Sequence, residues 1–193
     1  MSSSIIKIKP VITKADRKIF IKLIWDIYKD DPRWVPPIIM ERMAAIDPNK
    51  NPYFEHAKVK LWIAYKDGNP VGRISAQIDE LVSINHGINT GHYGYFDCIN
   101  NKEVANALFD TACCWLRENG MIEVIGPFSL SINEETGLLV EGFDTPPMLL
   151  MGHSRPYFEN LVLGTGLKKI KDTWAYRLDI KKPILSPVLE KLI

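Results

Sequence analysis

The sequence has few cysteines, little net charge and no long apolar run, and each shortage excludes a class of protein. Its three cysteines, Cys98, Cys113 and Cys114, are an odd number with an adjacent pair, which argues against a disulfide framework and favours a reducing cytoplasm. The net charge is +1 over 193 residues, so no global field attracts nucleic acid or an anionic membrane. No apolar stretch approaches the ~20 residues that cross a bilayer, and the N-terminal residues lack a signal-peptide pattern.

Signatures of metal and phosphate sites are also missing. There is no Cys-x-x-Cys or His-x-x-x-His spacing, and His92 and His153 stand alone, so we expect no metal and structural roles for both. The stretch from Gly164 to Gly166 is too short for a phosphate loop and follows a predicted helix instead of a strand. A lysine cluster comes next and is typical of a solvated face, although it can also meet an anionic ligand. Its members are Lys168, Lys169 and Lys171.

The composition is that of a globular protein, with 46% hydrophobic and 24% charged residues. Local patterns predict strands over residues 5–12, 57–65, 71–78, 92–99, 121–126 and 173–180. Asp67 and Gly68 mark a tight hairpin between the second and third of these. Helices are predicted from a capping box at Thr13, over residues 38–46, from Asn100 or Asn101 to residue 119, and over residues 157–163.

The order of these elements predicts the sheet. The strand, helix and strand between residues 92 and 126 form a crossover unit, whose two strands are parallel. The front half of the sheet, which contains the hairpin at Asp67 and Gly68, is expected to be antiparallel. We therefore expect an α/β (α+β) fold with a mixed, mostly antiparallel sheet, one parallel strand pair and helices on both faces.

Two long connections are candidates for functional roles. The first, residues 31–52, carries five prolines and Trp34. It is either a long connection that packs over the surface for structural reasons, which we favour, or a lid over a cleft. The second, residues 126–147, follows a parallel strand, where sites in α/β sheets gather. A carboxylate there, Glu134, can act as a general base toward an amine, and Asn133 can orient a carbonyl. Alternatively, this connection is an Ω-like loop with solvated acids. Further substrate-contact candidates in it are Ser131, Glu135 and Asp144.

Together these features resemble the GNAT superfamily of acyl-CoA N-acyltransferases. The resemblance rests on the hairpin at residues 67–73, the helix ending at Gly120, the strand after it, and the stretch 157–167, which looks like the late helix of the family with its Gly-Phe ending changed to Gly166-Leu167. Three segments, residues 31–37, 51–56 and 126–147, resemble the N-terminal half of uncharacterised bacterial proteins that carry two GNAT-like halves.

The resemblance implies transfer of an acyl group from acetyl-CoA or another acyl-CoA to an amine of unknown identity. It also implies a domain over residues 1–180, with residues 181–193 starting a linker or helix toward a second GNAT-like half. Two departures stand out. The pyrophosphate loop of the family has no glycine here, and the position of its general-acid tyrosine holds Val162; Tyr157, five residues upstream, is the substrate-binding candidate. The alternative is therefore a degenerate, non-catalytic half that shapes a substrate cleft or packs against a catalytic partner.

Overall fold

The computed structural model describes residues 5–82 and 89–176, and its centre is a five-stranded sheet in the order β1-β2-β3-β4-β5. Successive strands pair antiparallel except β4 and β5, which are parallel. The predicted mixed sheet with one parallel pair is thereby confirmed. The strands are β1 (Ile6–Pro10), β2 (Ala57–Lys66), β3 (Asn69–Asp79), β4 (Thr90–Cys98) and β5 (Glu123–Ile125).

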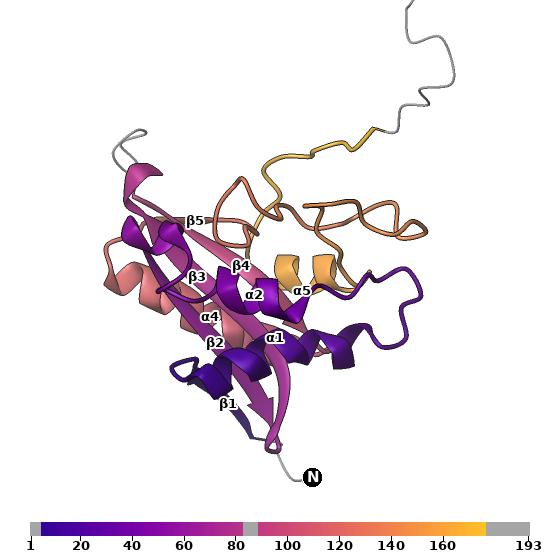
Figure 1. Ribbon diagram of the computed structural model, residues 1–193, viewed down its shortest axis with the longest axis horizontal. Coiled ribbons are helices and arrows are strands. Elements are labelled where there is room, and N and C mark those ends of the chain that lie inside the picture. Colours follow the sequence, from indigo (N-terminus) through magenta and orange to yellow (C-terminus); the bar gives the residue numbers. More distant parts are fainter. Residues whose placement is uncertain (1–4, 83–88, 177–193) are drawn as a thin grey trace, which may run out of the picture.

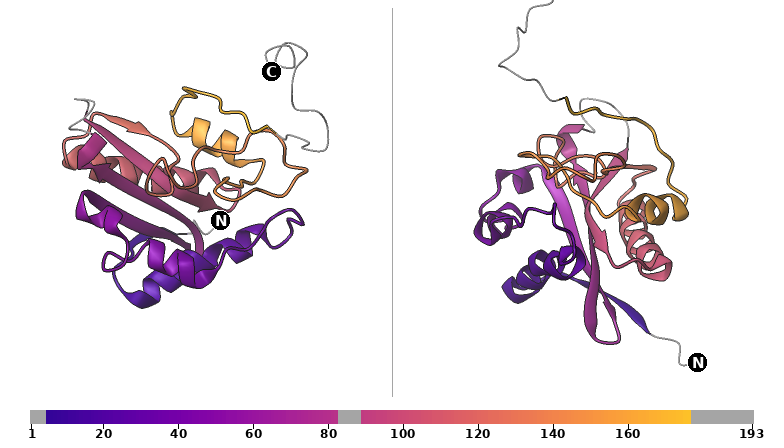
Figure 2. Two further views of the ribbon diagram at one scale, coloured as in Figure 1. Left: turned by 45° about the horizontal axis from the view of Figure 1, so that its top comes forward. Right: turned by 90° about the vertical axis from the view of Figure 1, so that its right-hand side faces the viewer.

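Helices cover both faces of the sheet, as Figure 1 and Figure 2 show. One face carries α1 (Lys14–Tyr28) and α2 (Ile39–Ala45), and the other carries α4 (Lys102–Glu118) and α5 (Phe158–Gly164). A short 3-10 helix, η1 (Pro52–Glu55), precedes β2. Apolar side chains fill both layers, because α1, α4 and α5 each present an apolar stripe to the sheet, whereas α2 buries none of its residues. The most deeply buried large ones include Phe20, Ile74, Leu108 and Phe158, each at most 1% exposed.

Local signals place the ends of these elements. The Thr13 hydroxyl accepts the Asp16 N–H at 3.1 Å while the Asp16 carboxylate accepts the Thr13 N–H at 2.8 Å, which is the predicted capping box of α1. Of the two predicted caps of α4, Asn101 is the one used, and its side chain accepts the Val104 N–H at 3.0 Å. Asp67 turns the β2–β3 hairpin at a φ of +50°, next to Gly68.

The end of the chain differs from the prediction. Residues 173–176, expected to begin a strand, are exposed and form no strand, and none of the five strands of the described sheet pairs with them. The remainder of that predicted strand, the helix expected at residue 186 and the domain boundary at residue 181 lie outside the described residues. None of the described helices is long and apolar enough to cross a membrane.

A β-bulge in β4 directs three consecutive side chains of this strand toward one cavity. Arg73 pairs with Asp97 and Ser75 pairs with Gly94, so two residues of β4 lie opposite Ile74 alone. Tyr95, inside the bulge, has a φ of +45°, an uncommon conformation for a bulky residue. Such bulges bend a strand and redirect its side chains. Here the side chains of β4 from Tyr95 to Asp97 all line one cavity.

Candidate functional site

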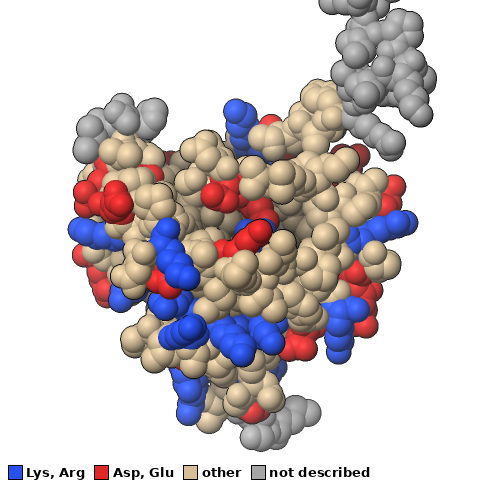
Figure 3. Space-filling view, viewed as in Figure 1, with Lys and Arg blue, Asp and Glu red and all other residues tan. Residues whose placement is uncertain are grey.

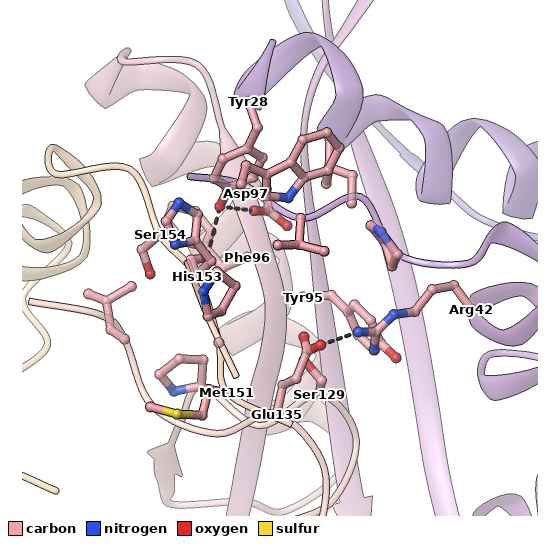
Figure 4. Close-up of a pocket in the computed structure, with 18 of the residues that line it drawn as sticks. Tyr28, Arg42, Tyr95, Phe96, Asp97, Ser129, Glu135, Met151, His153 and Ser154 are labelled. Carbon is pink, nitrogen blue, oxygen red and sulfur yellow. Dashed lines mark hydrogen bonds and ion pairs between the residues drawn. The ribbon is translucent and has the colours of Figure 1, made fainter. Parts of the chain in front are cut away.

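The bulged end of β4 forms part of a cavity of about 120 Å³. One wall comes from the proline-rich connection and includes Trp34 and Val35, and the opposite wall comes from the loop after β5 and includes Pro147 and Met151. Figure 3 shows this face of the molecule, hollowed near its centre, where acidic and basic side chains meet. Figure 4 shows the side chains that line the cavity.

A buried ion pair lies beneath the cavity. The Arg73 guanidinium donates to Asp97 Oδ2 from Nε and Nη2, both at 2.8 Å, and to the Phe20 carbonyl oxygen at 2.9 Å. Arg73 is 6% exposed and Asp97 7%. The Tyr28 hydroxyl lies 2.8 Å from Asp97 Oδ1 (Figure 4). Burial and the neighbouring Asp97 charge raise the pKa of Tyr28 well above its ordinary value, so this phenol stays protonated and donates.

His153, on the loop after β5, forms hydrogen bonds to the opposite wall of the cavity. Its Nε2 lies 2.9 Å from Asp31 Oδ2, and its carbonyl oxygen lies 3.0 Å from the Tyr28 hydroxyl. His153 Nδ1 is buried and has no hydrogen-bond partner among the described residues, so we assign the proton to Nε2, which donates to Asp31. Burial raises the pKa of Asp31, but the His153 hydrogen bond, the Arg33 backbone N–H and the Arg155 charge together bring it below its ordinary value. The expectation of a structural His153 fits this arrangement.

A second ion pair stands at the cavity surface. Arg42, on α2, donates to Glu135 Oε1, and the two side chains are 25% and 27% exposed (Figure 4). Burial lowers the pKa of Arg42 but the Glu135 charge outweighs it, so the guanidinium stays charged. Unlike the Asp97 carboxylate, the Glu135 carboxylate is partly open to a ligand. An ammonium group entering the cavity can therefore replace Arg42 as its partner.

The structure separates the site residues predicted from the sequence. Glu135 lines the cavity. Asn133, Glu134 and Asp144 are exposed and lie outside its lining. The Ser131 hydroxyl accepts the Asn133 N–H at 3.2 Å, a local turn of the kind expected in an Ω-like loop. These four assignments remain predictions.

Tyr157 also lies outside the cavity lining. Its hydroxyl donates to the Cys98 carbonyl oxygen at 3.0 Å, at the end of β4. Burial raises its pKa to about 12. The phenol is therefore protonated at neutral pH and already engaged by the backbone. Its predicted contact with substrate remains a prediction.

Most of the residues that form the site carry no predicted role. These are Tyr28, Arg42, Arg73 and Asp97. The proline-rich connection supplies Trp34 to the cavity, and its role as structural packing or as a lid stays a prediction. One available signal was an arginine within the alternating strand 71–78, since charged residues in a strand of a two-sided layer are buried only when paired.

A second cavity, of about 180 Å³, lies behind the first. The two cavities share Pro127, Gly137 and Leu138 as a common wall. Its lining is mixed. Apolar side chains come from β5, α5 and the segment after α5, and the charged members are Glu159, Lys168, Lys169, Lys171 and Asp172. Of the three lysines, Lys169 contacts Asp172 at 3.1 Å.

The start of α4, where the family resemblance implies a phosphate loop, offers little to an anion. The Asn101 side chain occupies the Val104 N–H, and Glu103 stands in the first turn. A carboxylate there competes with a phosphate for the positive end of the helix dipole.

Neither cysteine chemistry nor metal binding has support in the described residues. The pKa of each cysteine is raised, that of Cys98 and Cys113 chiefly by burial and that of Cys114 by its hydrogen bond to Glu118. No group of three His, Cys, Asp or Glu side chains in the described part of the chain could hold a metal ion.

Two solved structures resemble this architecture. An aminoglycoside acetyltransferase from an uncultured soil metagenomic sample, solved with sisomicin, matches with a TM-score of 0.54 and 13% identity, over 90% of this chain and 97% of that one. A tandem GNAT protein from the clavulanic acid biosynthesis pathway matches with a TM-score of 0.53 and 12% identity, over 84% of this chain and 43% of that one. The chain has the GNAT fold. A scan against models of protein families finds no match.

Two curated proteins are similar in sequence. Bacterial ceramide synthase of Caulobacter vibrioides is 47% identical over 171 residues, which are 88% of this chain and 44% of that protein. Protein YghO of Escherichia coli is 41% identical over 186 residues, which are 96% of this chain and 47% of that protein. The chain thus spans about half the length of the curated relatives that it matches.

Proposed function

We propose that this chain supplies the amine-binding site of a GNAT-type N-acyltransferase. The observation that carries the proposal is the cavity beside β4, in which the partly open Glu135 carboxylate is held by Arg42 within an acetyltransferase fold. The donor is acetyl-CoA or a longer acyl-CoA. The 47% identity to a bacterial ceramide synthase supports a long-chain amino alcohol as the acceptor, because a ceramide is the fatty amide of such an amine.

The proposed reaction is direct transfer. Glu135 takes a proton from the ammonium group of the acceptor, and the free amine nitrogen attacks the thioester carbonyl carbon. The C–N bond forms as the C–S bond breaks, and a second proton lost from the nitrogen passes to the leaving coenzyme thiolate, which leaves the amide nitrogen with one hydrogen. Glu135 then releases the first proton to water. The acyl chain lies along the apolar part of the second cavity in this proposal, since only the wall formed by Pro127, Gly137 and Leu138 separates that cavity from the amine site.

We also propose that the phosphates of the coenzyme are held by another part of a longer protein, in a second GNAT-like half. The similarity to a tandem GNAT protein, of which this chain covers 43%, supports this arrangement. Asn101 and Glu103 at the start of α4 favour it as well, because they leave no glycine loop for a phosphate. The same lack of a glycine loop at the start of α4 supports a second candidate function, in which this chain is a non-catalytic half that only shapes the substrate cleft.

The test compares two neighbouring carboxylates in the protein encoded by the complete gene. With acyl-CoA and a long-chain amine, Glu135→Gln is expected to lower kcat/KM at least about 100-fold, the usual effect of losing a general base. The matched variant Glu134→Gln changes an exposed side chain outside the cavity lining and is expected to stay within about twofold. Both variants should have the same thermal unfolding midpoint as the unchanged protein, so that a change in rate reflects catalysis and not stability. An unchanged rate for Glu135→Gln would contradict the proposal, and the reversed pattern would make Glu134 the base, as the sequence predicts.

A further inference from the structure

Exposed apolar side chains border the mouth of the cavity on two sides. The proline-rich wall contributes Val35 to the lining and continues outward to Met40, and the opposite wall contributes Met151 and continues to Leu149. We call these residues the apolar rim. Its members, with their exposed fractions, are Val35 (56%), Ile38 (59%), Met40 (79%), Met148 (70%), Leu149 (91%) and Leu150 (53%).

Single exposed apolar residues are ordinary, but two runs beside one site are not. The loop that carries Leu149 is fixed at its base. Met151 bridges to Thr136, and the Leu139 N–H donates to the Ser154 hydroxyl at 3.1 Å. The loop that carries the exposed residues Met148, Leu149 and Leu150 is therefore attached to the rest of the fold on both sides of them. Figure 3 shows a broad uncharged surface beside the central carboxylates.

The segment after α5, which runs near the loop after β5 (Figure 1 and Figure 2), carries exposed apolar residues and three lysines. The segment after α5 carries Ile170 and Trp174, 74% and 71% exposed, next to the three lysines of the second cavity. Figure 1 and the left view of Figure 2 place this yellow segment and the orange loop after β5 near each other. Apolar side chains that project from a surface with nearby lysines and tryptophan are typical of lipid interfaces, where lysines add attraction to anionic headgroups.

We propose that the apolar rim docks on a bilayer that contains anionic phospholipid, so that the cavity opens toward the membrane. The identity of the amine drawn from that membrane rests on the proposed function, whereas docking itself does not. A net charge of +1 argues against long-range attraction to a membrane, and for that reason the sequence predicts no membrane partner. Docking of the rim is instead local, through insertion of apolar side chains at short range.

The first experiment measures binding of the protein encoded by the complete gene to vesicles of equimolar phosphatidylcholine and phosphatidylglycerol, by flotation. Leu149→Glu should lower the bound-to-free ratio at least about tenfold, because a charge replaces an inserted leucine. Ile122→Glu is the matched control, since Ile122 is 84% exposed but precedes β5 and lines neither cavity. Its binding should equal that of the unchanged protein. Absence of vesicle binding, or equal loss in both variants, would overturn the proposal.

The second experiment decides whether the rest of a longer chain covers the rim instead. In a Cys114→Ser background, which removes the exposed native thiol, Leu149→Cys should react with a thiol reagent in solution and be protected when vesicles are added. Protection without vesicles would mean that protein covers the rim, and would overturn the proposal. Because neither experiment measures catalysis, a failure of acyl transfer alone would refute only the proposed function.

Discussion

Replacing Asp97 with asparagine tests the buried ion pair beneath the cavity. Asparagine keeps the shape of the side chain and can still accept the Tyr28 hydroxyl, whose oxygen lies 2.8 Å from Asp97 Oδ1. What it removes is the negative charge opposite Arg73, which is 6% exposed. Breaking a buried pair in this way costs about 3–5 kcal/mol, because one charge is left uncompensated.

The expected loss is large compared with the ~5–15 kcal/mol that holds a typical domain folded. For a chain of this length it lowers the thermal midpoint by on the order of 10 °C. Chemical denaturation of purified variants measures the free energy of unfolding from the midpoint and slope. Asp110→Asn, an exposed aspartate on α4, is the matched control and should stay within about 0.5 kcal/mol.

A double variant separates charge from packing. Arg73→Met with Asp97→Leu replaces both charges by apolar side chains of similar size, which is often neutral or stabilising for a buried pair. Tyr28 keeps the His153 carbonyl oxygen, at 3.0 Å, as an acceptor. The double variant should therefore be more stable than Asp97→Asn. If Asp97→Asn unfolds like the unchanged protein, or the double variant is the less stable of the two, the reasoning is refuted.

Two further predictions concern Asp31 and the coenzyme. Because the folded-state pKa of Asp31 lies below its ordinary value of ~3.9, the charged carboxylate stabilises the fold above that pH, and this contribution disappears as the pH falls below it through the folded-state pKa. In Asp31→Asn the thermal unfolding midpoint should therefore fall less steeply as the pH is lowered than in the unchanged protein. Equal pH dependence in the two proteins would contradict this prediction. The 193-residue chain by itself should bind acetyl-CoA weakly or not at all in calorimetry, because Asn101 and Glu103 stand where the resemblance to the GNAT superfamily implies a glycine loop; micromolar binding would contradict this.

The fold was predictable because its signals are local. The Thr13 capping box, the Asp67 turn and the Asn101 cap each operate within a few residues, so each can be recognised in a short window of sequence. The parallel pair followed from chain order alone. The predicted last strand failed at residues 173–176, where alternation was present but no neighbouring strand supplied hydrogen bonds.

The site depends on contacts that no short window contains. Tyr28 and Asp97 are 69 residues apart, and His153 and Asp31 are 122 apart. The polar side of β3 shows the same limit. Gln77, fully buried, donates to the Phe128 carbonyl oxygen at 2.8 Å, a partner on the loop after β5. Polar residues in an alternating strand usually face water, but here α1 covers Arg73 and the loop after β5 covers Gln77, so this strand is buried on both sides.

Some polar groups around β4 are already bound to other groups of the protein, whereas others are open to a ligand. This difference indicates which substrate of a transfer reaction the chain could bind. At the end of β4 the Cys98 carbonyl oxygen already accepts the Tyr157 hydroxyl, and the first turn of α4 is capped by its own Asn101. Groups that could hold the coenzyme there are thus committed to internal hydrogen bonds. Glu135, by contrast, remains partly exposed with Arg42 as its one ion-pair partner among the described residues. Under the proposed function, the amine side of the reaction therefore belongs to this chain, and the phosphates of the donor need contacts from elsewhere.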